Sequence, residues 1–149
     1  MILDFLKKIS IEDQITTHFR FKDALFLASW QMYAFPPDEQ TKYNIFSVSM
    51  KLEEIRALFG DRQIFVTSWY RPKVYDNFIK KKDLFFNSVS KHTLGKAVDF
   101  NVFGIEPKAV QAKILENIDR LQVRLELNTP SWTHIDLDYK PNQNNTFFG

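Results

Sequence analysis

The chain contains no cysteine among its 149 residues, and this absence removes several kinds of site at once. Disulfides, cysteine-ligated zinc and thiol catalysis all need a sulfur that the sequence does not supply. No apolar run approaches the ~20 residues that span a bilayer, so a membrane-spanning helix is not expected. The first ten residues also lack the basic start and long apolar stretch of a secretory signal.

An excess of charge of one sign is missing as well. Twenty Lys and Arg oppose 18 Asp and Glu, which leaves a net charge of +2. This balance does not argue for a nucleic-acid partner, and none is expected. The short basic run at residues 80–82 is followed by Asp83, and we interpret it as a solvated loop or helix end rather than a phosphate-binding patch.

Apolar and aromatic residues are abundant. Hydrophobic residues make up 44% of the chain, and 15 phenylalanines predict a core built on rings. The length predicts one domain over residues 1–149. Apolar residues of the first ten would cluster on one face of a short helix, so residues 1–17 are expected to form an N-terminal docking segment, with a membrane anchor as the less favoured alternative. Residues 140–149, rich in Asn, are expected to form a loop-like C-terminal tail.

Apolar periodicity places the main elements. Helical spacing predicts helices over residues 21–33, 41–59 and 107–121. β-rich stretches predict strands over residues 63–68, 97–103, 123–127 and 132–137, the last two joined as a hairpin. Residues 74–86 are ambiguous, with a helix that leads into a loop as one reading. Helices come first and strands then surround one helix, so we expect an α+β fold in which a small antiparallel sheet packs against N-terminal helices and one crossover helix.

Two of the three histidines lie in segments that also carry carboxylates. His92 and Asp99 are seven residues apart. A continuous helix would separate them by about 10 Å along its axis. A continuous strand would separate them by about 23 Å and turn them to opposite faces. The chain must therefore bend between them if both are to reach one ion, and Gly95 is where a bend brings least steric strain.

The remaining histidine of this set lies in a predicted strand. His134 and Asp136 are two residues apart, so they share a face of that strand. Catalytic zinc takes three protein ligands and keeps one position for water. His92, Asp99 and His134 supply that number, which makes a zinc hydrolase with one Zn²⁺ the leading hypothesis. His18 has no such neighbours and is interpreted as a structural or surface residue.

These residues also carry a family resemblance. The pattern Ser90-x-His92-x-x-Gly95-x-Ala97-x-Asp99 resembles the zinc-binding signature of the D-alanyl-D-alanine carboxypeptidase and hedgehog-type zinc peptidases. The supporting segments lie before and after it, at residues 18–23, 67–72 and 132–136, and the first of them is similar to the opening of a carboxypeptidase-like subfamily common in bacteria and phages. The similarity covers roughly residues 18–139.

The resemblance implies a peptidase that acts on the peptide part of the bacterial cell wall, with zinc held by His92, Asp99 and His134. Arg71 would pair with a substrate carboxylate or with the developing oxyanion, because its donors form a rigid fork. Tyr70 and Ser90 are further expected substrate-binding residues. Ordering of the loop is an alternative role for Ser90.

The sequence departs from the family pattern in two places. Several members carry Glu or Asp three residues before the last histidine ligand as general base, and here that position is Ser131. Asp136, on the same strand face as His134, is our first candidate to replace it, although Asp136 could equally orient a ligand. Glu126, on the preceding strand of the hairpin, is the second candidate. Trp69 stands where the family often has Gly, and we expect it to narrow the cleft.

The expected function is hydrolysis of a peptide bond in the stem or cross-link of peptidoglycan, by a phage-encoded lysis or virion-associated protein. Such a protein would remain in the host cytoplasm before release or travel with the particle, with virion or phage tail proteins as candidate partners, and would act at the cell wall. The alternative is an inactive zinc-containing binding or structural module, because hedgehog-type members keep zinc for recognition. Carboxypeptidase, dipeptidase and L-alanyl-D-glutamate endopeptidase specificities all remain open.

Overall fold

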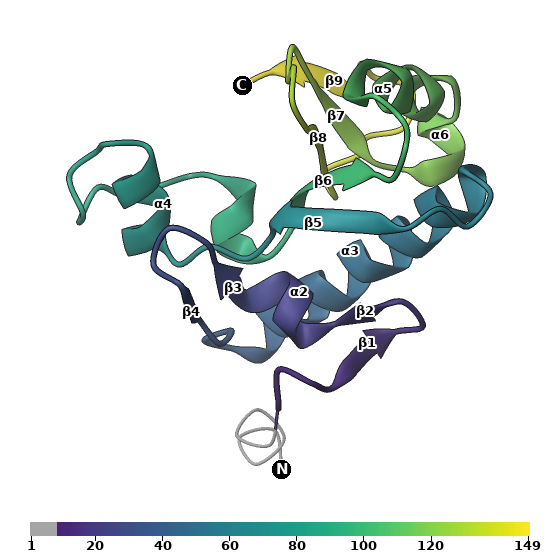
Figure 1. Cartoon of the computed structure of the whole chain (residues 1–149). Helices are drawn as coiled ribbons and strands as arrows, with labels where there is room; N and C mark the ends of the chain where they lie inside the picture. The colour runs from purple at the N-terminus through teal and green to yellow at the C-terminus, as the bar shows by residue number, and fades with distance from the viewer. Residues whose placement is uncertain (1–8) are drawn as a thin grey trace.

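A mixed α+β architecture is built around one five-stranded sheet, with strand order β5-β6-β8-β7-β9. The computed structural model describes residues 9–149, and Figure 1 shows the course of the chain. The sheet strands are β5 (Ile64–Ser68), β6 (Ala97–Val102), β7 (Arg124–Leu127), β8 (Thr133–Asp136) and β9 (Thr146–Phe148). Residues 1–8 of the predicted docking segment lie outside the described residues.

The two faces of the sheet differ because side chains alternate along each strand. Val98, Phe100 and Ile135 belong to a buried apolar cluster that also contains Ile45 and Ile114 from the helices. The residues between them turn to the opposite face of the sheet. The sheet therefore has one face in the hydrophobic core and one polar face that carries the candidate site.

The long helix α3 (Glu39–Leu58) begins and ends close to the predicted bounds of 41–59. Asp38 caps it by accepting a hydrogen bond from the backbone N–H of Thr41 at 2.8 Å. Its buried residues recur at helical spacing, which is why this prediction succeeded. They include Ile45, Val48, Leu52 and Ile55.

The crossover helix between β6 and β7 is also present, but in two pieces. Residues 107–121 form α5 (Pro107–Glu116) and the short α6 (Ile118–Leu121), because Asn117 between them leaves helical geometry with φ −116° and ψ 17°. The ambiguous segment resolves into α4 (Lys73–Ile79) followed by a loop. In Figure 1, α4 projects away from the sheet on the side opposite α5 and α6.

The prediction of a helix over residues 21–33 is wrong. This stretch forms a short α2 (Phe21–Leu25) and then a hairpin of β3 (Phe26–Leu27) and β4 (Met32–Tyr33). Met32, which the helical pattern placed in the core, is 49% exposed. The rings of Phe26 and Tyr33 pair across the hairpin at 5.3 Å, and such cross-strand aromatic contacts favour a strand over a helix.

The prediction that residues 140–149 form only a loop is also wrong. Strand β9 pairs with β7 in parallel, so it adds one parallel edge to an otherwise antiparallel sheet. The side chain of Asn145 closes the preceding loop, because it accepts from the backbone N–H of Lys140 and donates to the carbonyls of Lys140 and Gln143. The loop thus returns the chain to the sheet edge, where Phe147 aligns with Glu126.

The N-terminal part of the described chain packs against α3. Strands β1 (Gln14–Thr16) and β2 (Phe19–Arg20) form a hairpin, and His18 between them meets Glu53 of α3, with its Nδ1 2.6 Å from Oε1. This contact supports the structural interpretation of His18. Within the described residues, no helix combines the length and the apolar character that crossing a membrane requires.

Gly95 ends a short 3-10 helix, η1 (Lys91–Leu94), in the left-handed conformation with φ +72°. A Cβ at this position would lie 3.0 Å from both the Thr41 carbonyl oxygen and Ile45 Cγ1 of α3. Glycine is therefore required twice, once for its backbone angle and once for the close approach of the turn to the helix. This is the bend that the spacing of His92 and Asp99 predicted.

Substitution of two left-handed glycines, Gly60 and Gly95, separates these two requirements. Gly60 has φ +69° with nothing within 4 Å of an added Cβ, so Gly60→Ala should lose only the backbone term, about 1–2 kcal/mol of unfolding free energy. Gly95→Ala should lose clearly more, because Thr41 and Ile45 must also move. Urea unfolding of both variants measures the difference. Equal losses would show that the contact with α3 does not constrain the turn.

Candidate metal centre

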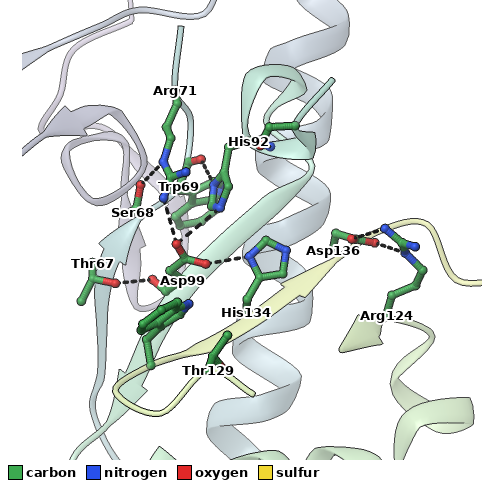
Figure 2. A network of polar contacts seen from close by, with 12 residues as sticks. Thr67, Ser68, Trp69, Arg71, His92, Asp99, Arg124, Thr129, His134 and Asp136 are labelled. Carbon is green, nitrogen blue, oxygen red and sulfur yellow. Dashed lines mark hydrogen bonds and ion pairs between the residues drawn. The ribbon is translucent and has the colours of Figure 1, made fainter. Parts of the chain in front are cut away.

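Three side chains from three elements meet on the polar face of the sheet. His92 comes from η1, Asp99 from β6 and His134 from β8 (Figure 2). All three are buried, and one ligand atom from each lies within 4.8 Å of the others. The three candidate metal ligands of the sequence are thus brought together.

The sheet register and the glycine turn explain this convergence. Asp99 and His134 are direct partners in the antiparallel pair β6–β8, so their side chains leave the sheet on the same face at the same level. His92 lies outside the sheet, and the turn at Gly95 folds η1 back toward Asp99. Short segments of regular geometry therefore fix all three positions.

The hydrogen bonds of the two imidazoles fit a metal ion. His92 Nδ1 lies 2.7 Å from the Trp69 carbonyl oxygen, which can only accept, so Nδ1 carries the proton and Nε2 keeps its lone pair. That Nε2 lies 3.4 Å from Asp99 Oδ2, and His134 Nδ1 lies 2.7 Å from Asp99 Oδ1. Two imidazoles and one carboxylate are a donor set that zinc prefers, and an outer carbonyl on a ligating histidine is typical of zinc sites.

The protonation states also fit. Burial lowers the pKa of His92, against the opposing effect of Asp99, so the ring is neutral as a metal ligand must be. Burial alone would raise the pKa of Asp99, but its contacts with His134 and His92 hold the pKa well below its ordinary value. Asp99 is therefore an ionised carboxylate among neutral or cationic groups. These residues can hold one zinc ion.

Arg71 lies directly against this group, and the family resemblance implied such a position. Its Nη2 donates to Asp99 Oδ2 at 3.0 Å, its Nε to Ser68 Oγ at 2.7 Å and its Nη1 to Asp76 Oδ1 at 3.2 Å. The side chain is only 11% exposed. The sequence analysis identified Arg71 but not its partner Asp76, which lies in no motif.

The other residues of the same motif fall into two groups. Ser90 caps η1, because its Oγ accepts from the backbone N–H of His92 at 3.3 Å, and it also lines the hollow beside the centre. Tyr70 is 5% exposed and packs in the apolar core, so the geometry gives no support to its predicted contact with substrate. Trp69 is buried in the same core with its ring edge against Phe19. It therefore fills the core and does not narrow the cleft, contrary to our expectation.

Asp136 shares the face of His134, as its spacing indicated, but both of its oxygens are engaged. Arg124 of β7 donates its Nε to Oδ1 at 2.9 Å and its Nη2 to Oδ2 at 2.7 Å. The backbone N–H of Asp138 also donates to Oδ1. The Arg124 guanidinium lies 4.3 Å from the Phe147 ring centroid, and that ring contacts the ring of His134 edge-on at 5.7 Å.

Glu126 occupies the more open position. The β7–β8 register pairs Arg124 with Asp136 and Leu125 with Ile135, and one further step along the two strands puts Glu126 across from His134. Within the described part of the chain, no side-chain hydrogen bond or ion pair engages its carboxylate. Burial raises the pKa of Glu126, and the charge of Asp99 adds to this, against opposing effects of His134, Lys80 and Arg71.

A hollow of about 330 Å³ lies over this face. Its rim carries more positive than negative side chains, and both histidine-bearing segments contribute to its wall. The residues that line it are Lys80, Lys82, Phe86, Ser88, Val89, Ser90, Lys91, Arg124, Glu126, His134, Asp136 and Phe147.

Comparison with protein families gives a match over most of the chain. The family model described as Peptidase M15 matches residues 27–136. This stretch includes the three buried ligand candidates together with Arg71. Searches of curated proteins and of solved structures found no match.

Zinc titration tests the three ligands directly. We expect one zinc per chain by isothermal titration calorimetry, and His92→Ala, Asp99→Ala and His134→Ala should each weaken binding by more than the roughly 10–100-fold lost with an outer hydrogen-bond partner. His18→Ala is the matched control, because this third histidine lies on the far hairpin with Glu53. Zinc affinity that falls equally in the control would contradict the assignment.

Proposed function

We propose, since the chain belongs to the Peptidase M15 family of zinc peptidases, that it hydrolyses a peptide bond in the stem or cross-link of bacterial peptidoglycan. The single observation that carries this proposal is the buried group of His92, Asp99 and His134, which lies within the matched segment and can hold one metal ion. The peptidoglycan substrate is inferred from the sequence resemblance.

In the proposed reaction, the metal ligands and Arg71 have different roles. A zinc ion held here would act as a Lewis acid that polarises the scissile carbonyl and activates water. Asp99 and the two imidazoles present the ligands. Arg71, a fixed cation at the edge of the site, stabilises a substrate carboxylate or the negative charge that develops on the carbonyl oxygen.

We assign the general base to Glu126 rather than to Asp136. The carboxylate of Asp136 is held by both nitrogens of the Arg124 fork, and a carboxylate in that state is a weak base. Glu126 lines the hollow opposite His134 and keeps its oxygens free of other side chains in the described residues. It can take a proton from water and return it to the leaving amine.

We also propose that the protein is phage-encoded and acts at the cell wall, either after release from the host cytoplasm or from within a virion. Support comes from the likeness of residues 18–23 to a carboxypeptidase-like subfamily common in bacteria and phages. Virion or phage tail proteins are the partners that this proposal implies.

A second candidate function is a zinc-containing binding module without turnover. The observation in its favour is Ser131, which replaces the acid that several family members use as base. The two candidates differ in one measurable property, because both bind zinc but only the enzyme consumes substrate.

Mass spectrometry of muropeptides separates the candidates. Purified peptidoglycan incubated with the zinc-loaded protein should release new amino termini, and the product masses identify the bond that is cut. A chelator and the His134→Ala change should each abolish release, whereas His18→Ala should retain it. Full zinc occupancy with unchanged muropeptides would support the binding module instead.

The assignment of the base predicts different effects on kcat for substitution of Glu126 and of Asp136. Glu126→Gln should lower kcat by about 10²–10⁴-fold while zinc binding is retained, because the proton acceptor is lost. Asp136→Asn removes the partner of Arg124 and should reduce stability, with kcat within about tenfold of the parent at temperatures where it is folded. Steady-state rates and zinc content of both variants are the measurements. A large loss of kcat in Asp136→Asn alone would return the base role to Asp136.

A further inference from the structure

A second buried carboxylate lies one step outside the metal centre. Asp76, on α4, is 0% exposed and belongs to none of the motifs in the sequence. Its Oδ1 accepts from Arg71 Nη1 at 3.2 Å, and its Oδ2 accepts from Ser88 Oγ at 2.6 Å and lies 3.0 Å from Lys80 Nζ. One carboxylate thus joins Arg71, the end of α4 and the loop that follows it.

The charge on Asp76 needs an explanation, because burying an ionised carboxylate is unfavourable unless it is fully paired. Burial alone would raise its pKa, but the contacts from Ser88, Lys80 and Arg71 hold the pKa below its ordinary value. The neighbouring Asn77 is equally buried and anchors the same loop without charge, since its Nδ2 donates to the carbonyls of Leu84 and Phe86. Anchoring the loop therefore does not require a carboxylate.

The geometry of Arg71 shows what the charge can do. A guanidinium has five N–H donors, and Ser68, Asp76 and Asp99 take one each. Two carboxylates and a hydroxyl accept hydrogen bonds from three different nitrogens of the guanidinium, so its plane is fixed relative to Asp99. Within the described residues, the other two N–H donors have no hydrogen-bond partner.

We propose that Asp76 is a positioning residue that fixes the Arg71 guanidinium beside Asp99, so that its remaining donors meet a carboxylate or the developing oxyanion of the peptide substrate. Through Lys80 and Ser88, which line the hollow, the same carboxylate couples the orientation of Arg71 to the loop that forms one wall of the site. This inference rests on the proposed function for its substrate, but not for the contact itself.

Asp76→Asn tests the proposal, because it preserves side-chain size and removes the charge. We expect kcat on muropeptides to fall about 10–100-fold with zinc stoichiometry unchanged, the range typical of outer partners of an active-site group. Asn77→Ala is the matched control, since it frees the loop without touching Arg71, and should keep kcat within a few fold. In an Arg71→Ala background, Asp76→Asn should cause little further loss. A fully additive loss would overturn the proposal.

A second readout is independent of turnover. In the zinc-loaded protein the Arg71 Nε–H proton should exchange slowly with solvent by NMR, and Asp76→Asn should accelerate this exchange while Asn77→Ala leaves it slow. Unchanged exchange in Asp76→Asn would reject the positioning role even if the substrate is a different peptide. Failure of the parent protein to cleave muropeptides, with the exchange result as expected, would reject only the proposed function. If Asp76→Asn does not fold, Asp76→Glu keeps the charge but displaces the carboxylate, and it must alter both readouts.

Discussion

The contact on which the site depends is that between Asp99 and His134, which face each other across two central strands. The antiparallel register of β6 and β8 sets their separation, and the resulting 2.7 Å contact between His134 Nδ1 and Asp99 Oδ1 aligns both side chains. Asp99 then receives Arg71 on its other oxygen, with His92 Nε2 close by. A one-residue slip of either strand would turn its ligand into the apolar core.

This dependence on register explains how the same strands carry both core residues and candidate metal ligands. The core residues Val98 and Ile135 flank the ligands in sequence and are themselves register partners, so the packing that stabilises the fold also holds the ligands at one level. The metal centre needs no dedicated scaffold, because the hydrophobic effect that fixes the strand pairing fixes the ligands as well. The glycine turn adds the third ligand from outside the sheet.

The sequence predicted those features that short-range patterns determine. The bend at Gly95, helix α3 and the β7–β8 hairpin follow from spacing and periodicity along the chain, and the ligand set follows from residue type together with the family resemblance. The errors lie where the pairing of strands decides the outcome. Residues 21–33 have helical spacing throughout, yet only 21–25 are helical and 26–33 form a hairpin. Residues 146–148 form a strand because they pair with the edge of β7. Asp76 carries no motif, and its importance appears only when Arg71 is seen beside it.

Ser131, which stands where family members carry an acid, also shows that position along the sequence and position in the folded structure differ. A base three residues before the last ligand reaches the site from the turn of the hairpin, whereas Glu126 reaches it from the opposite strand, across from His134. A β-hairpin places facing residues of its two strands about 4.5–5.5 Å apart at Cβ, close enough for a glutamate to serve the same hollow. Asp136 lies on that face as well, but it is hydrogen-bonded to the Arg124 guanidinium, which in turn packs on the Phe147 ring. We therefore interpret the Asp136–Arg124 pair as structural. The sheet thus offers two carboxylates to one site, and within the described residues side chains pair only with Asp136, which is why the base role is proposed for Glu126.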